Sequence, residues 1–175
     1  MGLSGQLEFE VEIKTPGSVF LEIYGSNKEH LPKICSHIVP RIDLLEGEWG
    51  QAGCVIMVYY SIVDMVMVVG GDDGGGCRRT IGGEGKEMTS KELVEEVDEK
   101  NKSITYNLLE GDLMKLYKTL RFTFQIITTN DAEFVKTKIE YEKVSEDAPY
   151  PDMLKDFVTA VTQTIDAYYS QVSNH

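Results

Sequence analysis

Hydrophobic and charged residues alternate strictly at the start of the chain. The hydrophobic positions are Leu7, Phe9, Val11 and Ile13. Because successive side chains of a strand point to opposite faces, this period of two predicts a strand lying on a core. The spacing then becomes helical, with hydrophobic residues at i, i+1, i+4 and i+5 in 19–24. A second short helix is expected from about Lys28 to Cys35, with Pro32 close to its start.

Strand patterns return after this helical region and continue through most of the chain. Strands are expected at 38–45, 55–63, 91–97, 104–108, 120–126 and 135–141. The segment 55–63, VIMVYYSIV, is almost continuously hydrophobic. We therefore expect both of its faces to be covered, or one face to line a cavity.

The last part of the chain is helical in its pattern. Hydrophobic residues recur at helical spacings from Leu154 to Val172, which predicts an amphipathic helix of about five turns. Pro149 and Pro151 flank its start, and Asp152 can cap it. The order is then one strand, two short helices, six strands and one long helix. Strands segregated from helices predict an α+β fold with a mostly antiparallel sheet, closed on one side by the long helix.

Length and composition limit the class of protein. The chain has 175 residues, of which 42% are hydrophobic, so we expect a single domain over 1–175 with a sizeable core. The net charge of −12 argues against nucleic acid and anionic membrane surfaces as partners. No hydrophobic run approaches the roughly 18 residues of a membrane helix, so stable membrane insertion is not expected. With no visible secretory signal and three cysteines without a CxxC pair, a cytoplasmic protein with reduced thiols is expected.

Three glycine-rich segments imitate ligand-binding loops without meeting their requirements. Segment 46–50, EGEWG, carries two glutamates that would repel phosphate, so we expect a tight turn with Trp49 packing across it. Segment 82–86 lacks the first glycine of a phosphate loop and the Ser or Thr that should follow Lys86. Segment 72–74 lacks the spacing of a calcium loop. No cofactor and no metal site are therefore expected.

Four strings in the chain resemble one family. They are GQLEFEVEIK near the start, LLEGEWG at 44–50, EEVDEKNKSITYNLLEGDLMKLYK at 95–118 and IEYEKVSEDAPYPD at 139–152. They are similar, in the same order, to the plant major latex protein (MLP-like) branch of the Bet v I, or pathogenesis-related class ten, superfamily. The resemblance reaches from one end of the chain to the other and leaves out mainly 63–87.

This resemblance implies a helix-grip (START-like) fold. In that fold a seven-stranded curved antiparallel sheet surrounds a long C-terminal helix, two short helices lie between the first two strands, and a large apolar cavity replaces a filled core. The expected cavity-lining, ligand-binding residues are Tyr59, Tyr106, Phe122, Phe124, Ile139, Tyr141, Phe157, Val161 and Tyr168. Tyrosines suit such a site because each gives an apolar body and one hydrogen-bonding tip. Ordinary core packing is the alternative role for part of this set.

Two functions remain open for such a cavity. The first is an intracellular binding protein or carrier for a small hydrophobic plant metabolite, such as a sterol, hormone or phenolic, linked to defence or stress. The alternative is a cofactor-independent enzyme for isomerisation, cyclisation or condensation. The candidate catalytic residues for such an enzyme are Glu110, Asp112, Tyr117 and Lys118. A buried carboxylate has a raised pKa and can shuttle protons. A buried, paired carboxylate or lysine in the cavity would favour chemistry.

A third function, a defence-associated interaction protein without a bound small molecule, also remains open. His30 and His37 lie in no recognisable catalytic spacing, so we expect them at the surface. The expected oligomeric state is a monomer or weak homodimer.

The segment at about 63–87 is where the chain departs most from its family. Where the family has a short hairpin turn, this chain carries DMVMVVGGDDGGGCRRTIGGEGKE. Glycine in this amount predicts a mobile hairpin insertion with a high ordering entropy. If this insertion has a function, we expect it to affect access to the cavity mouth, or to contact a partner or a second copy, rather than to take part in chemistry.

Overall fold

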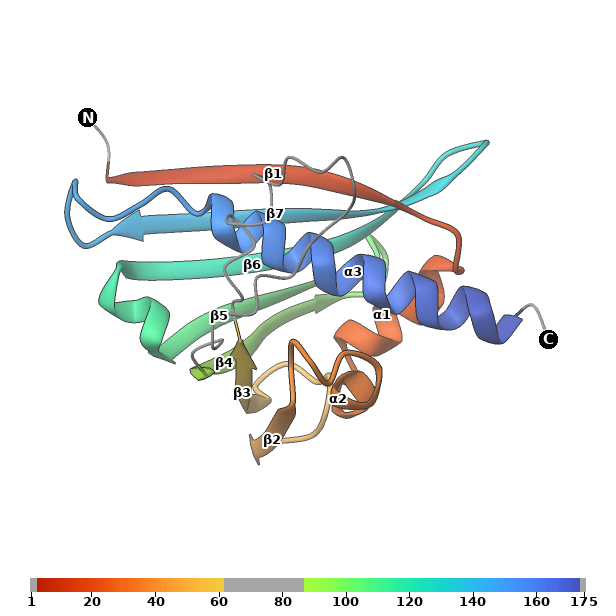
Figure 1. The fold of residues 1–175 in the computed structure, drawn as a ribbon, viewed down its shortest axis with the longest axis horizontal. Coiled ribbons are helices and arrows are strands. Elements are labelled where there is room, and N and C mark those ends of the chain that lie inside the picture. Colours follow the sequence, from red (N-terminus) through yellow and green to blue (C-terminus); the bar gives the residue numbers. More distant parts are fainter. Residues whose placement is uncertain (1–2, 62–86, 174–175) are drawn as a thin grey trace, which may run out of the picture.

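The structure is a computed structural model that describes residues 3–61 and 87–173, and side chains as far as residue 170. The expected insertion at about 63–87 and its motifs at 72–74 and 82–86 therefore fall outside the described residues. Figure 1 shows the order of the elements. They are β1 (Ser4–Ile13), α1 (Gly17–Tyr24), the 3-10 helix η1 (Lys28–His30), α2 (Leu31–Ile34), β2 (Arg41–Glu46), β3 (Val55–Ser61), β4 (Glu87–Asp98), β5 (Ser103–Gly111), the 3-10 helix η3 (Asp112–Lys115), β6 (Tyr117–Thr128), β7 (Glu133–Lys143) and α3 (Asp152–Ser173).

The seven strands form one antiparallel sheet in the order β1-β7-β6-β5-β4-β3-β2. Strands that follow one another in the chain are neighbours from β2 to β7. The first strand is the exception, since it pairs with the last one, with Leu7 opposite Ile139. The α1–α2 region between β1 and β2 carries the chain from one edge of the sheet to the other. This is the expected helix-grip fold, which the structure confirms.

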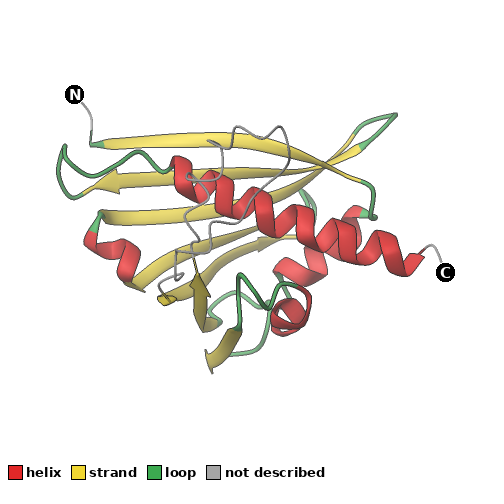
Figure 2. Cartoon of the chain, viewed as in Figure 1, coloured by secondary structure: helices red, strands yellow, loops and turns green. Residues whose placement is uncertain are grey.

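The long helix α3 lies across one face of the curved sheet (Figures 1 and 2). Its buried side chains include Leu154, Val158, Val161 and Ile165, the stripe that the spacing predicts. The helix is also held at the β1–α1 connection. There the Asp166 carboxylate accepts hydrogen bonds from the backbone N–H groups of Lys14 and Thr15, at 3.0 and 2.8 Å.

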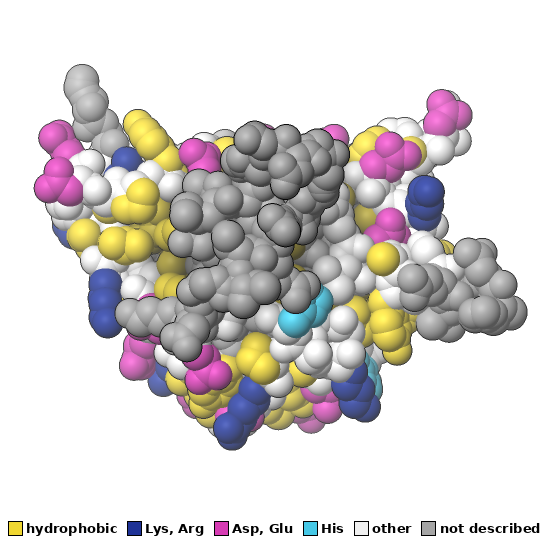
Figure 3. All heavy atoms as spheres, in the orientation of Figure 1, with side chains coloured by type: hydrophobic (Ala, Val, Ile, Leu, Met, Phe, Trp, Pro, Cys, Tyr) yellow, Lys and Arg dark blue, Asp and Glu magenta, His cyan; other side chains and the backbone are white. Residues whose placement is uncertain are grey.

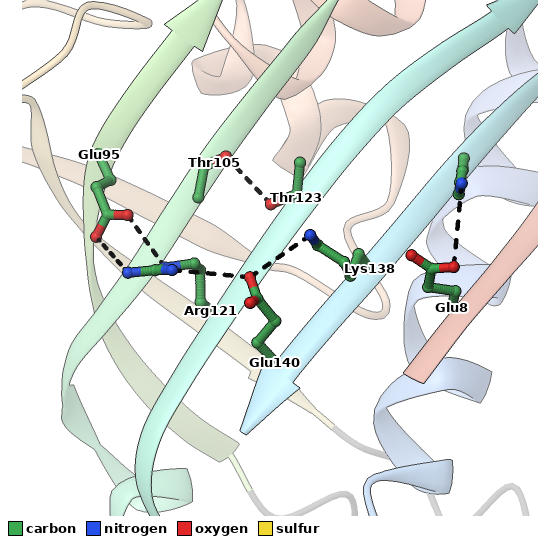
Figure 4. A network of polar contacts seen from close by, with 8 residues as sticks. Glu8, Glu95, Thr105, Arg121, Thr123, Lys138 and Glu140 are labelled. Atoms are coloured by element: carbon green, nitrogen blue, oxygen red, sulfur yellow. Dashed lines mark hydrogen bonds and ion pairs between the residues drawn. The ribbon is translucent and has the colours of Figure 1, made fainter. Parts of the chain in front are cut away.

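The surface of the described part mixes both signs of charge. On the face shown in Figure 3, acidic, basic and hydrophobic side chains are interspersed, and the basic side chains stand apart from one another. The outer face of the sheet carries a polar network (Figure 4). Arg121 on β6 pairs with Glu95 on β4 at 3.0 Å and with Glu140 on β7 at 3.8 Å. The hydroxyl groups of Thr105 and Thr123 lie 3.1 Å apart in the same network. The outer face of the sheet is therefore polar and faces solvent, whereas the opposite face packs against α3.

Element boundaries differ from the predicted ones in a few places. Strand β2 begins at Arg41 rather than at residue 38, because Pro40 before it has no N–H for a ladder hydrogen bond. The expected second short helix is present as η1 followed by α2, with Pro32 in its first turn. The short helix η3 was not expected. None of the described helices is long and hydrophobic enough to cross a membrane.

Candidate functional site

A cavity lies between α3, the short helices and the inner face of the sheet. Its volume is about 80 Å³, and a single water needs roughly 15 Å³. Among the described residues it is lined by Tyr24, Lys28, Leu31, Val39, Val58, Tyr60, Ser90, Glu92, Tyr106, Leu108, Leu113, Phe122, Phe124, Leu154, Phe157, Val158 and Val161. Most of these side chains are hydrophobic or aromatic, as in small-molecule sites generally.

Five of the nine expected ligand-binding residues line this cavity. They are Tyr106, Phe122, Phe124, Phe157 and Val161. Aromatic contacts hold several of them in place: the Phe124 ring stacks on Tyr24 with centroids 4.4 Å apart, and it meets the edge of Tyr106 at 6.3 Å. Their position on the cavity wall is thus given by the structure, and their contact with a ligand stays a prediction.

The other four expected residues do not line the cavity. Tyr59 lies on the opposite face of β3, where the Arg41 guanidinium is 5.1 Å from its ring centroid. Ile139 is fully buried in the filled part of the core. Tyr141 packs edge-on against Tyr117 beyond the cavity. Tyr168 is 43% exposed, because it lies on the outer side of α3. These assignments to the cavity wall were wrong.

The side chain that faces the cavity on β3 is Tyr60 instead of Tyr59. A one-residue change of register moves a strand's side chains to the opposite face. The hydrophobic run 55–63 has no polar alternation that would decide between the two faces. Sequence reasoning therefore selected the wrong tyrosine of an adjacent pair.

The proposed catalytic candidates do not meet in the cavity. Glu110 is exposed and forms an ion pair with Lys91 at 3.3 Å. Lys118 is exposed and forms an ion pair with Glu142 at 3.8 Å. The sequence places both residues near the junction of two strands, but their side chains point into solvent.

Asp112 and Tyr117 have structural contacts of their own. The Asp112 carboxylate accepts a hydrogen bond from the backbone N–H of Thr89 at 2.8 Å. The Tyr117 hydroxyl donates to the carbonyl of Pro149 at 2.8 Å, and burial raises the pKa of Tyr117 to about 12. The four candidates therefore form no common site.

The structure shows a buried ion pair that sequence reasoning missed. Lys28 on η1 and Glu92 on β4 both line the cavity, with Nζ and Oε1 3.6 Å apart. The Lys28 ammonium also lies 3.7 Å from the ring centroid of Tyr106. Burial lowers the pKa of Lys28, and the neighbouring Glu92 charge opposes this shift.

Two hydroxyl groups in the cavity wall were also missed. Tyr60 and Ser90 are 4% and 1% exposed, and within the described part of the chain their hydroxyl groups have no hydrogen-bond partner. Burial, with the charges of Glu92 and Asp112, raises the pKa of Tyr60. The sequence does contain a pattern that could have indicated Ser90 and Glu92. Alternation along β4 places both on the same inward face as buried Val94.

The glycine-rich connection between β2 and β3 is a loop, as its composition predicts. Gly47, Gly50 and Gly53 all have positive φ angles, and Trp49 packs partly buried against the core. Elsewhere, His37 is exposed and His30 is half-buried at the surface. No three His, Cys, Asp or Glu side chains gather in a metal-binding arrangement within 3–61 and 87–173.

Comparison with known proteins gives a consistent family. The model of the pathogenesis-related protein Bet v 1 family matches residues 2–71 and 63–171. MLP-like protein 34 of Arabidopsis thaliana is 30% identical over 95% of this chain, which spans 46% of that relative's length. MLP-like protein 43 of the same plant is 29% identical, over 95% of this chain and 93% of its own length.

Solved structures agree with this comparison. Ginseng major latex-like protein 151 from Panax ginseng matches with a TM-score of 0.81 and 32% identity, over 95% of this chain and 98% of its own. A START superfamily protein from Mycobacterium smegmatis matches with a TM-score of 0.66 over 95% of this chain and 98% of its own. At 13% identity, the second match shows a shared fold alone.

Proposed function

This chain belongs to the pathogenesis-related protein Bet v 1 family, in its major latex protein branch, and from this premise we propose that it binds a small hydrophobic molecule in the cavity beneath α3. The observation that carries the proposal is the cavity wall, in which aromatic and aliphatic side chains surround a few buried polar groups. Pockets of this composition bind small ligands through apolar contact and use the polar groups for orientation.

The size of the cavity limits what it accepts. Its volume of about 80 Å³ is smaller than the roughly 150 Å³ of a cavity that binds benzene, so a single-ring compound fits with small shifts of the wall. A larger ligand, such as a sterol, requires the ring of Phe122 or Phe157 to change rotamer, and both side chains are only partly buried.

The biological setting is part of the same proposal. The family's name, pathogenesis-related, supports a role in defence or stress responses. Cys35 and Cys54 are buried free thiols, which supports a reducing compartment such as the cytoplasm. We propose one domain over 1–175 with an insertion at about 63–87, and the overlap of the two family matches at 63–71 supports this position.

One observation favours an enzyme as the second candidate function. The Lys28–Glu92 pair is a buried, paired lysine and carboxylate inside the ligand cavity. A lysine with a lowered pKa next to a carboxylate can move a proton to or from a bound molecule. The reaction would be a cofactor-independent isomerisation, cyclisation or condensation.

Native mass spectrometry after exposure to a plant extract tests the binding proposal. We expect wild-type protein to retain a small apolar compound, and Val161→Phe to lose at least about 90% of it, because the added ring fills the cavity. Ala167→Phe is the matched control, since it adds the same group to an exposed position of the same helix. Overpacking costs roughly 1–3 kcal/mol, so circular dichroism must show that both variants are folded.

The same experiment separates the two candidate functions. Compounds retained unchanged support a binding protein, whereas compounds converted faster than in buffer support an enzyme. Equal retention by wild type and Val161→Phe would contradict binding in this cavity.

A further inference from the structure

The cavity wall carries two neighbouring residues with hydroxyl groups, Tyr60 and Ser90. We infer that these two hydroxyls recognise the carbonyl oxygen of an uncharged, largely apolar ligand. This inference rests on the proposed binding function and specifies the chemistry of its ligand.

The first observation is that these groups, although buried, have no hydrogen-bond partner among the described residues. A buried donor without a hydrogen bond is rare in proteins, because its desolvation is not compensated. Other tyrosine hydroxyls of the cavity wall are paired: Tyr24 shares a hydrogen bond with Thr162 at 2.7 Å, and Tyr106 donates to the Tyr24 carbonyl. Tyr60 and Ser90 thus differ from the neighbouring hydroxyls that serve the fold.

The second observation is their common position. Ser90 lies opposite Val58 in the β3–β4 ladder, and Tyr60 lies opposite Met88. The two residues are therefore diagonal neighbours on the inner face, a spacing that the long side chain of Tyr60 can cross toward the short one of Ser90. The Tyr60 ring packs against Phe157 with centroids 5.4 Å apart, which restrains the ring while the cavity is unchanged.

The third observation is the charge of the cavity. Lys28 and Glu92 already compensate each other, so an anionic ligand would add a buried charge without a counter-charge. A hydrocarbon ligand would leave both hydroxyls without a partner. An uncharged carbonyl oxygen has two lone pairs and accepts from both hydroxyl donors.

Three single-ring probes of similar size test this inference. Acetophenone carries the carbonyl, α-methylstyrene has the same shape without oxygen, and benzoate carries a negative charge. Their dissociation constants are measured by NMR titration with wild type, Tyr60→Phe, Ser90→Ala and the double variant. Tyr59→Phe is the matched control, because it removes a hydroxyl from the opposite face of the same strand.

We expect Tyr60→Phe and Ser90→Ala each to weaken acetophenone binding by about 3- to 10-fold, the range of a single hydrogen bond. Binding of α-methylstyrene should stay equal or become tighter, and Tyr59→Phe should change neither. The unliganded variants should be as stable as wild type, since each loses a hydroxyl without a partner. A structural role for these hydroxyls would lower stability instead and overturn the inference.

The remaining outcomes distinguish this inference from the proposed function. If acetophenone and α-methylstyrene both bind, and neither variant changes the ratio of their dissociation constants from that of wild type, the inference fails and the proposed function stands. Tighter binding of benzoate than of acetophenone also overturns the inference alone. If none of the probes binds the wild type, the inference and the proposed cavity fail together.

Discussion

At the residue scale, the Lys28–Glu92 pair couples the short helix η1 to strand β4. The side chains are 8% and 15% exposed, so each charge depends on the other for compensation. We predict that Glu92→Gln lowers the free energy of unfolding by about 3 kcal/mol, because it leaves a buried ammonium without its counter-charge. The double variant Lys28→Met/Glu92→Leu should recover all but about 1 kcal/mol, since it removes both charges. Urea unfolding measures these values.

A matched pair on the outer face of the sheet serves as the control. Arg121 and Glu95 are 44% and 34% exposed (Figure 4), so Glu95→Gln should cost less than about 1 kcal/mol. Similar losses for Glu92→Gln and Glu95→Gln would contradict the assigned role of burial.

Such a pair could not be predicted from the sequence, for a physical reason. Lys28 and Glu92 belong to elements far apart in the chain, and single charged residues ordinarily mark solvent-facing positions. Only the fold brings η1 against the inner face of β4. The hydrophobic positions of α3 were predictable, because helical spacing is local, and this is why Phe157 and Val161 were found.

At the element scale, the corner between β4, β5 and η3 builds the wall that carries Ser90. Gly111 lies opposite Ser90 with φ 132° and ψ −177°, a conformation that essentially only glycine adopts. A Cβ at this position would overlap the Thr89 carbonyl oxygen and lie 2.9 Å from the Ser90 Cα. This close approach also lets Asp112 accept the Thr89 N–H.

We predict a different cost for the same substitution at two glycines. Gly53 also has a positive φ, 92°, but a Cβ there would meet no atom within 4 Å. Backbone strain should therefore lower the free energy of unfolding by about 1 kcal/mol in Gly53→Ala, whereas Gly111→Ala should lower it by about 3 kcal/mol or more. Thermal unfolding compares the two variants, and equal melting temperatures would show that the close contact at Gly111 carries no energy.

The elements themselves followed from local patterns, with two kinds of exception. Strand and helix order was predictable because alternation and helical spacing extend over whole elements. The helix η3 was missed because its four residues are too few for a period. Strand β3 was found, but its inward face was not, because a continuous hydrophobic run does not distinguish Tyr59 from Tyr60.

At the scale of the whole molecule, buried and partly buried tyrosines make the protein less stable at alkaline pH. The pKa values of Tyr24, Tyr60, Tyr106, Tyr117 and Tyr169 are all raised, in each case chiefly by burial. In the unfolded chain these groups lose their protons near pH 10. Their contribution to stability is thus fully present below pH 10 and is lost as the pH rises further. Lys28, whose pKa is lowered, acts in the opposite direction below its ordinary value of 10.5, but it is one group against five.

We therefore predict that the free energy of unfolding falls between pH 10 and 11.5, by about 1.4 kcal/mol per pH unit for each tyrosine that stays protonated. Urea unfolding at a series of pH values measures the slope, and absorbance at 295 nm reports tyrosinate. General repulsion at the net charge of −12 also lowers stability at high pH. Tyr60→Phe separates the two effects, because it removes one buried hydroxyl that has no hydrogen bond within 3–61 and 87–173, and it leaves the charge below pH 10 unchanged. Its slope should be smaller than that of wild type by about 1.4 kcal/mol per pH unit, and identical slopes would show that ionisation of Tyr60 does not contribute to the loss.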